Sequence, residues 1–163
     1  ISILEIFKEF NMKNLQLKWP NDIMINNNKV CGVLIENNII NENLFFSAIG
    51  IGFNISIPNN LLSLINENVA NLDIDSDDLE VLIPKLIQHI ITNISLLKNH
   101  GFVLFKEKFN NHMYAKNKNV VVKNNSHEII GKLFGINEDG CLEIHTKHGV
   151  EKINTLDYSL RVL

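Results

Sequence analysis

The stretch Lys18-Trp19-Pro20-Asn21-Asp22 decides how the first third of this chain folds. Pro20 disfavours helical geometry at the residue before it, so the segment is predicted to be extended, with its polar ends held in fixed directions. Lys29 follows seven residues after Asp22, and we expect these two charges on opposite arms of a β-hairpin. The alternative is a plain turn at Asn21-Asp22 with Lys29 as a solvated edge charge, and the pattern alone favours that alternative.

The hairpin is predicted from the residues on either side of its turn. Residues 23–25 and 30–36 form its two strands. Asn26-Asn27-Asn28 lies between them, and asparagine tolerates the left-handed backbone geometry that tight turns need. A further strand, from Phe45 to Ile57, is predicted to follow the hairpin.

The segment Ile49-Gly50-Ile51-Gly52-Phe53-Asn54 places two glycines inside that apolar strand. Glycine weakens a strand, so it normally marks a bulge or a place where a ligand or another backbone comes close. Alternation puts Gly50, Gly52 and Asn54 on one face. The dinucleotide-binding fingerprint is not complete, because a third glycine and a following helix are missing. Tight packing of the strand on a helix explains the glycines equally well.

Helical spacing of apolar residues predicts an amphipathic helix over the first ten residues. The sequence given starts abruptly, without methionine or a capping residue, so we expect the natural beginning of the protein to lie elsewhere. Residues 58–76 are polar and are expected to form a surface loop. A helix that begins after Gly101 is predicted over residues 102–111.

A longer helix is predicted between that loop and Gly101. Asp77, with Glu80 three residues later, resembles a capping box that opens a helix running to about Lys98. Pro84 lies inside this pattern, so either the helix kinks there or its regular part begins there.

The last fifty residues switch to short strands with tight turns. Strands are predicted over residues 120–123, 128–134, 142–145 and 150–153, with turns at Asn124-Asn125 and Asp139-Gly140. The chain is therefore predicted to have a mixed α/β fold (α+β), with a first domain over residues 1–112 and a small barrel-like domain over residues 113–163.

Composition and charge exclude several classes of protein. The net charge of −3 argues against a general nucleic-acid binder. Cys31 and Cys141 lie far apart without metal-binding or redox spacing, and the six histidines form no ligand pattern, so we expect reduced thiols and no metal site. No apolar run approaches the roughly 18 residues of a membrane span, and a cytoplasmic protein is expected.

Arg161 is the only arginine, although the chain has 15 basic residues. Drift toward AT-rich codons turns exchangeable arginine into lysine. An arginine that is retained therefore indicates a partner that requires the planar guanidinium and its two parallel hydrogen bonds. The partner is a phosphate, a carboxylate, or Asp157 in an internal ion pair, and base rates slightly favour the internal pair.

Taken together, these segments resemble the biotin protein ligase family. The stretch 18–22 is similar to the family's KWPND signature, and residues 29–36 resemble its K-x-x-G-[IV]-L-[IV]-E strand at the right distance. Residues 49–54 are similar to its IGIGxN strand, and residues 130–161 resemble its C-terminal SH3-like barrel.

The resemblance implies a catalytic core akin to that of class II aminoacyl-tRNA synthetases, followed by an SH3-like β-barrel. It implies an enzyme that uses biotin, ATP and Mg²⁺ to make biotinyl-5′-AMP. The biotin then passes to a lysine of a biotin carboxyl carrier protein, the subunit of acetyl-CoA carboxylase. It also implies a cytoplasmic protein that forms a dimer in some cases.

The same resemblance implies a role for each motif residue. Lys29 and Asp22 would be catalytic, with Lys29 touching both the biotin carboxylate and the α-phosphate. The implied biotin-binding residues are Lys29, Gly32, Gly50 and Gly52, and the implied ATP-binding residues are Lys18, Asn21, Asn54 and Arg161.

The chain departs from the family pattern upstream of its first motif. The family's GRGRxGR loop and any DNA-binding domain would lie there, and the sequence given has only one predicted helix in that place. We therefore expect the C-terminal half or two-thirds of such an enzyme, with little or no activity alone. A truncated or split binding module without chemistry is the alternative, and an SH3-like nucleic-acid-binding protein is a remote third.

Overall fold

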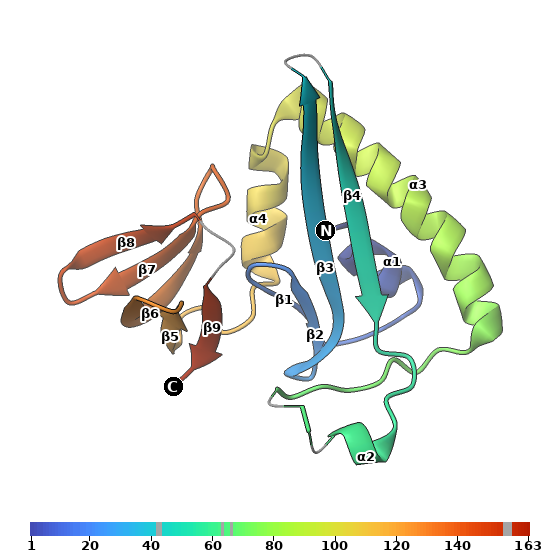
Figure 1. Cartoon of the computed structure of the whole chain (residues 1–163), viewed down its shortest axis with the longest axis horizontal. Coiled ribbons are helices and arrows are strands. Elements are labelled where there is room, and N and C mark those ends of the chain that lie inside the picture. Colours follow the sequence, from blue (N-terminus) through green and yellow to red (C-terminus); the bar gives the residue numbers. More distant parts are fainter. Residues whose placement is uncertain (42–43, 63, 66, 155–157) are drawn as a thin grey trace.

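The computed structural model describes residues 1–41, 44–62, 64–65, 67–154 and 158–163, which form two antiparallel sheets and flanking helices (Figure 1). The helices are α1 (Ser2–Glu9), α2 (Asn59–Leu62), α3 (Ser76–His100) and α4 (Val103–Asn111). The first sheet contains β1 (Leu15–Lys18), β2 (Asp22–Ile25), β3 (Asn28–Asn41) and β4 (Leu44–Phe53). The second contains β5 (Asn119–Lys123), β6 (Glu128–Ile136), β7 (Leu142–Thr146), β8 (Gly149–Ile153) and β9 (Ser159–Val162). The prediction of a mixed α/β fold is confirmed.

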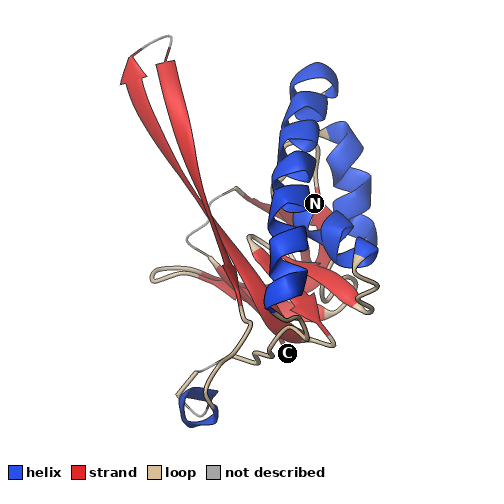
Figure 2. Cartoon of the chain, turned by 90° about the vertical axis from the view of Figure 1, so that its right-hand side faces the viewer, coloured by secondary structure: helices blue, strands red, loops and turns tan. Residues whose placement is uncertain are grey.

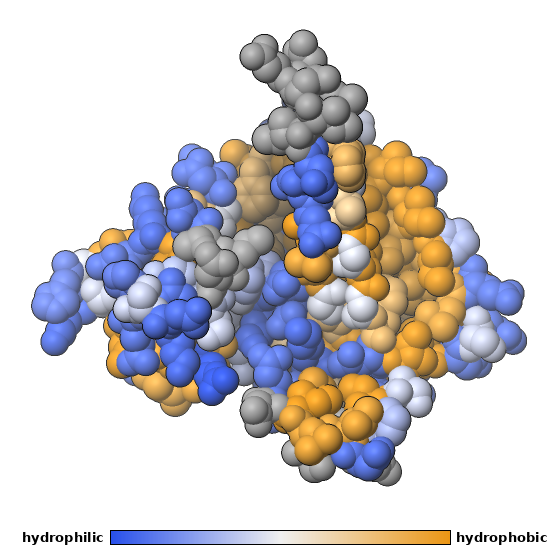
Figure 3. Space-filling model, viewed as in Figure 1, coloured by the Kyte–Doolittle hydropathy of each residue, from blue (hydrophilic) through white to orange (hydrophobic). Residues whose placement is uncertain are grey.

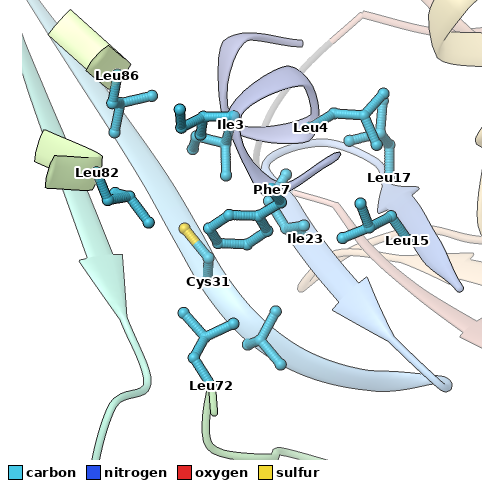
Figure 4. Packing of buried hydrophobic residues seen from close by; sticks show 12 residues of the cluster. Ile3, Leu4, Phe7, Leu15, Leu17, Ile23, Cys31, Leu72, Leu82 and Leu86 are labelled. Atoms are coloured by element: carbon cyan, nitrogen blue, oxygen red, sulfur yellow. The ribbon is translucent and has the colours of Figure 1, made fainter. Parts of the chain in front are cut away.

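One face of the first sheet forms the main core. Leu17 pairs with Ile23, Ile23 with Cys31 and Cys31 with Phe53, so these four side chains stand in one row across β1 to β4. Helices α1 and α3 cover this row (Figures 2 and 4), and the rings of Phe7 and Phe53 lie 5.8 Å apart. The alternate residues of the same strands therefore point to the opposite face.

The predicted hairpin is confirmed and is longer than expected. Its turn is made by Asn26 and Asn27, which both adopt positive φ. Strand β3 runs on past Glu36 and pairs with β4 from Cys31 to Asn41, while β4 ends at Phe53 instead of Ile57. The far half of the β3–β4 hairpin projects away from the helices (Figure 2), which leaves Ile35, on the core face of β3, half exposed.

Helix α3 corrects the predicted capping box. Its N-cap is Asp75, whose carboxylate accepts a hydrogen bond from the backbone N–H of Asp78, not the pair Asp77 and Glu80. A capping residue needs an extended backbone, and Asp75 has it (φ −105°, ψ −170°), whereas Asp77 already lies inside the helix. The helix begins at Ser76, well before Pro84, so the alternative that its regular part starts at Pro84 is wrong.

The other helical predictions hold with small shifts. The opening helix and the helix after Gly101 are confirmed as α1 and α4. The loop of residues 58–76 contains the short helix α2, which the polar composition gave no reason to expect. Among the described helices, none has an apolar stretch long enough to cross a membrane.

The C-terminal strands form an open sheet in the order β8-β7-β6-β5-β9. The four predicted strands are confirmed, and β9 is an additional short strand that pairs with β5. The pairing found in the described residues closes no barrel, so the SH3-like barrel stays a prediction.

A seam joins the two sheets. The backbone of Leu17 in β1 accepts a hydrogen bond from the N–H of Tyr114 and donates one to the carbonyl of His112. Trp19 is 6% exposed and packs into the second core, against the side chains of the C-terminal sheet. The chain segment with the KWPND-like sequence therefore belongs to both halves of the molecule.

Candidate functional site

The candidate site lies on the face of the first sheet that points away from the main core. Lys18 pairs with Asp22, Asp22 with Gly32 and Gly32 with Gly52. Residues that pair directly across antiparallel strands share a face, so these four form one row across β1 to β4. Hydrogen-bonded pairing thus brings three separate sequence motifs side by side.

Asp22 is the centre of the charges in this row. Its Oδ1 lies 2.7 Å from Nζ of Lys29, and its Oδ2 lies 3.9 Å from Nζ of Lys18. Among the described residues, Asp22 is the one charged group in the buried class, at 8% exposure. A buried carboxylate needs compensating charge, and the two ammonium groups supply it. The alternative in which Lys29 is only a solvated edge charge does not fit this contact.

Glycine keeps the neighbourhood of this ion pair open. A Cβ at Gly32 would lie 3.3 Å from Cε of Lys29, tighter than usual, and 3.4 Å from Oδ1 of Asp22, an ordinary contact distance, so a side chain there would press on the ion pair. Gly50 and Gly52 are both exposed, and Gly50 pairs with Leu34 next to the charged row. The sheet surface beside the Lys29 ammonium is therefore bare backbone, which a flat ligand can approach closely.

Two asparagine side chains bind the backbone of β3. Nδ2 of Asn21 donates to the carbonyl of Val33 at 2.7 Å, and Nδ2 of Asn54 donates to the carbonyl of Lys29 at 2.9 Å. Each amide nitrogen therefore has one of its two N–H groups fixed within the protein, and the other N–H and the amide oxygen are left to face a ligand.

Arg161 reaches the same region from β9. It lines a pocket of about 330 Å³ together with Lys18 and Lys29, so the C-terminal sheet and the first sheet share this hollow. The expected internal partner of Arg161, Asp157, lies outside the described residues. Figure 3 shows this polar region between the two sheets, beside an apolar surface over α3.

The structure also places residues in the site that the sequence did not indicate. Glu67 lies 3.5 Å from Nζ of Lys18 and, like Tyr114, lines the shared pocket. Both follow stretches without clear periodicity, and only the fold brings them to the lysines. Within the described ranges, no group of three or more His, Cys, Asp or Glu side chains could hold a metal ion.

In its fold and in part of its sequence, the chain is similar to the biotin and lipoate ligase class. Residues 4–54 match the model of the Biotin/lipoate A/B protein ligase family, and this range includes most of the residues described above. Comparison over the whole chain narrows the class: the chain is a biotin protein ligase-like protein.

The curated relatives are longer than this chain. It is 26% identical over 165 residues to the bifunctional ligase/repressor BirA of Bacillus subtilis, which covers 98% of this chain and 50% of that protein. It is 22% identical to BirA of Escherichia coli, with 87% of this chain and 45% of the relative covered. The chain therefore spans about half the length of the curated relatives it matches.

Solved structures agree with the fold. The biotin protein ligase from Aquifex aeolicus, in complex with biotin and ATP, superimposes with a TM-score of 0.82 at 28% identity, covering 99% of this chain and 68% of that one. The biotin acetyl coenzyme A carboxylase synthetase from Helicobacter pylori has a TM-score of 0.56 at 22% identity, with 93% and 61% covered, and shows the fold alone.

Proposed function

We propose that this chain is the Lys29-bearing and C-terminal part of an ATP-dependent biotin protein ligase. It would join biotin to ATP as biotinyl-5′-AMP and pass the biotin to a lysine of a biotin carboxyl carrier protein. One observation carries the proposal: Nζ of Lys29, held by Asp22 at 2.7 Å, stands beside a glycine-bare sheet surface. The similarity to a ligase solved with biotin and ATP supports biotin and ATP as the substrates that this arrangement would bind.

The first step brings two anions together. An oxygen of the biotin carboxylate attacks the α-phosphorus of ATP, and pyrophosphate leaves. Negative charge grows on the phosphoryl oxygens as this happens, so a fixed ammonium between the reacting groups lowers the barrier. Lys29 suits this role because its ion pair with Asp22 sets the position of the ammonium before substrates bind.

The second step transfers the biotinyl group. The amine of the carrier lysine attacks the biotinyl carbonyl, and AMP leaves with the electron pair of the broken bond. The attacking amine must lose a proton, and we propose that Asp22 assists because its carboxylate lies beside Lys29 on the same face.

The remaining site residues receive the roles that the resemblance implies. We propose that Gly32, Gly50 and Gly52 let the flat rings of biotin lie against the sheet. Asn21 and Asn54 would face the adenine through their amide oxygens. Two further cations, Lys18 and Arg161, line one pocket with Lys29, and they would contact the phosphates or the carrier.

Magnesium is not assigned to residues of this chain. Asp22 and Glu67 are the described carboxylates near Lys29, and each is paired with a lysine ammonium. Carboxylates in such pairs are poor magnesium ligands, and Mg²⁺ normally binds through substrate phosphates and few protein groups. The proposed steps therefore use only the side chains named above.

The finer architecture belongs to the same proposal. Residues 1–112 would be the catalytic domain and residues 113–163 an SH3-like barrel, which the open sheet of β5 to β9 would form. We propose a cytoplasmic location, where the carrier protein of acetyl-CoA carboxylase would be met.

The test is formation of biotinyl-5′-AMP from biotin and ATP labelled at the α-phosphate. It is measured for this chain, and for a chimera that adds the part of the Aquifex aeolicus ligase that the chain does not cover. Lys29→Ala is expected to lower the rate about 100-fold or more, as loss of a preorganised charge does. Lys13→Ala is the matched control, because Lys13 is exposed and lies outside the site. Equal rates for Lys29→Ala and the unsubstituted chimera would contradict the role of Lys29.

A binding module without chemistry is the second candidate, since the chain spans about half of its curated relatives and Gly50 and Gly52 are uncovered. It predicts that the chimera binds a carrier domain but makes no biotinyl-5′-AMP.

A further inference from the structure

A β-bulge lies at the start of β3, next to the central lysine of the site. Asp22 pairs with Gly32 and Ile23 with Cys31, but the next residue of β2, Met24, pairs with Lys29. One residue of β3, Val30, therefore has no partner in β2. Two residues opposite one is the definition of a bulge, and bulges redirect the side chains beside them.

The bulge decides which face Lys29 occupies. Regular alternation would put Lys29 and Gly32 on opposite faces, because they are three residues apart. Instead, Val30 and Cys31 are both buried in the main core, at 1% and 0% exposure, while Lys29 reaches Asp22 on the site face. If the same sequence paired with β2 without a bulge, the ammonium of Lys29 would point at the apolar core.

Asn54 holds both sides of this bulge. Its backbone N–H donates to the carbonyl of Val30 at 2.8 Å, and its side-chain Nδ2 donates to the carbonyl of Lys29 at 2.9 Å. Two consecutive carbonyls at the bulge thus each accept a hydrogen bond from the same residue. Buried or half-buried carbonyls without such partners cost free energy, so Asn54 favours the bulged backbone over the regular one.

A second segment, residues 68–72, also bonds to this part of the chain. We call its hydrogen bonds, together with those from Asn54 to β3, the clamp. The N–H of Lys29 donates to the carbonyl of Asn68 at 2.8 Å, and its carbonyl accepts from the N–H of Ala70 at 3.0 Å. The carbonyl of Asn54 itself accepts from the N–H of Leu72 at 2.6 Å. Asn54 therefore links the bulge to this segment, and it is the one member of the clamp that acts through its side chain.

From these contacts we infer that Asn54 is a positioning residue for Lys29: it stabilises the bulge that turns the ammonium onto the site face. The inference rests on the proposed function for its catalytic consequence but not for its structural one. This positioning role of Asn54 is separate from the proposed contact between its amide oxygen and the adenine.

A double-mutant cycle in urea unfolding tests the inference without any substrate. Asn54→Ala removes the side-chain donor, and Asn54→Asp removes it while keeping the shape. Each is made in the unsubstituted chain and in Lys29→Met, which lacks the ion pair with Asp22. If Asn54 supports that pair, substituting it lowers the folding equilibrium constant about tenfold in the unsubstituted chain. In Lys29→Met the same substitution should lower that constant by only about threefold or less.

Asn71→Ala is the matched control. Asn71 lies in the same loop, and its side chain accepts a hydrogen bond from the N–H of Ile57 at 2.8 Å. Its effect on folding is expected to be the same with and without the Lys29 side chain. Effects of Asn54→Ala and Asn54→Asp that are equal in the two backgrounds would overturn the inference.

Kinetics of biotinyl-5′-AMP formation in the chimera give the second readout. A positioning role predicts that Asn54→Ala lowers kcat, leaves KM for ATP within about twofold, and has no further effect in Lys29→Met. A raised KM for ATP that persists in Lys29→Met would overturn the positioning role and leave only adenine contact. An unsubstituted chimera without activity would contradict the proposed function, while the unfolding cycle would still decide the inference.

Discussion

At the scale of single residues, one carboxylate organises the site. Asp22 is buried and faces two ammonium groups, and removal of Lys29 would leave its carboxylate with only the more distant ammonium of Lys18, at 3.9 Å. The glycines matter for the opposite reason, because they contribute no side chain. Gly32 leaves the space that the Lys29–Asp22 pair occupies, so the charge and the gap beside it are set by two motifs that meet only in the folded sheet.

Cys31 lies in the neighbouring row of the same sheet. We predict that its thiol is unreactive toward thiol reagents in the folded chain. Burial raises the pKa of the Cys31 thiol to about 12, and the negative charge of Asp22 acts in the same direction. Only the thiolate reacts, so at pH 8 Cys31 should react with Ellman's reagent at least about 100-fold more slowly than a free thiol. The half-buried Cys141 should react first.

The measurement counts thiols before and after unfolding in urea. Cys141→Ser is the control and should show no fast thiol in the folded chain. A fast thiol in folded Cys141→Ser would mean that the core over Cys31 opens readily.

At the scale of elements, the cap of α3 offers a direct test of the corrected boundary. Asp75 accepts a hydrogen bond from the N–H of Asp78 at 2.9 Å. Asp75→Ala should therefore lower the free energy of unfolding by about 1 kcal/mol. Asp77→Ala should lower it by only a few tenths of a kcal/mol, since Asp77 makes no capping bond to the backbone and acts through the helix dipole and a long, exposed hydrogen bond from the Ser76 hydroxyl at 3.4 Å. Urea unfolding followed by circular dichroism distinguishes the two, and a larger loss for Asp77→Ala would restore the cap predicted from sequence.

The elements also show what the sequence could and could not predict. The hairpin, α1, α4 and the C-terminal strands follow local patterns, because apolar spacing and Asn-rich turns act over a few residues. The capping box was shifted by two residues, since several acids at the start of α3 fit the same pattern. The bulge at Val30 was not predicted, because alternation assumes regular pairing and only the partner strand reveals the extra residue. The clamp that holds Lys29 depends on that bulge and on contacts across the fold, so no local pattern contains it.

At the scale of the whole molecule, the site depends on contact between the two sheets. Trp19 sits between Lys18 and Pro20, yet its side chain packs in the core of the C-terminal sheet. The pocket that Lys18 and Lys29 share with Arg161 exists only while the two sheets stay together. A residue inside the site motif is thus also an apolar contact between the halves.

The last prediction concerns this contact. Trp19→Ala should lower the free energy of unfolding by about 3–5 kcal/mol, the usual cost of emptying a buried aromatic site. Phe134→Ala is the control: Phe134 is 53% exposed and stacks on His145, so its loss should cost less than about 1 kcal/mol. Urea unfolding is followed by circular dichroism, because Trp19 is the only tryptophan. In the unsubstituted chain, Trp19 fluorescence and circular dichroism should change together, since the seam makes the halves unfold as one unit. Separate transitions there, or an unchanged midpoint in Trp19→Ala, would show that the second sheet folds independently of the site it helps to line.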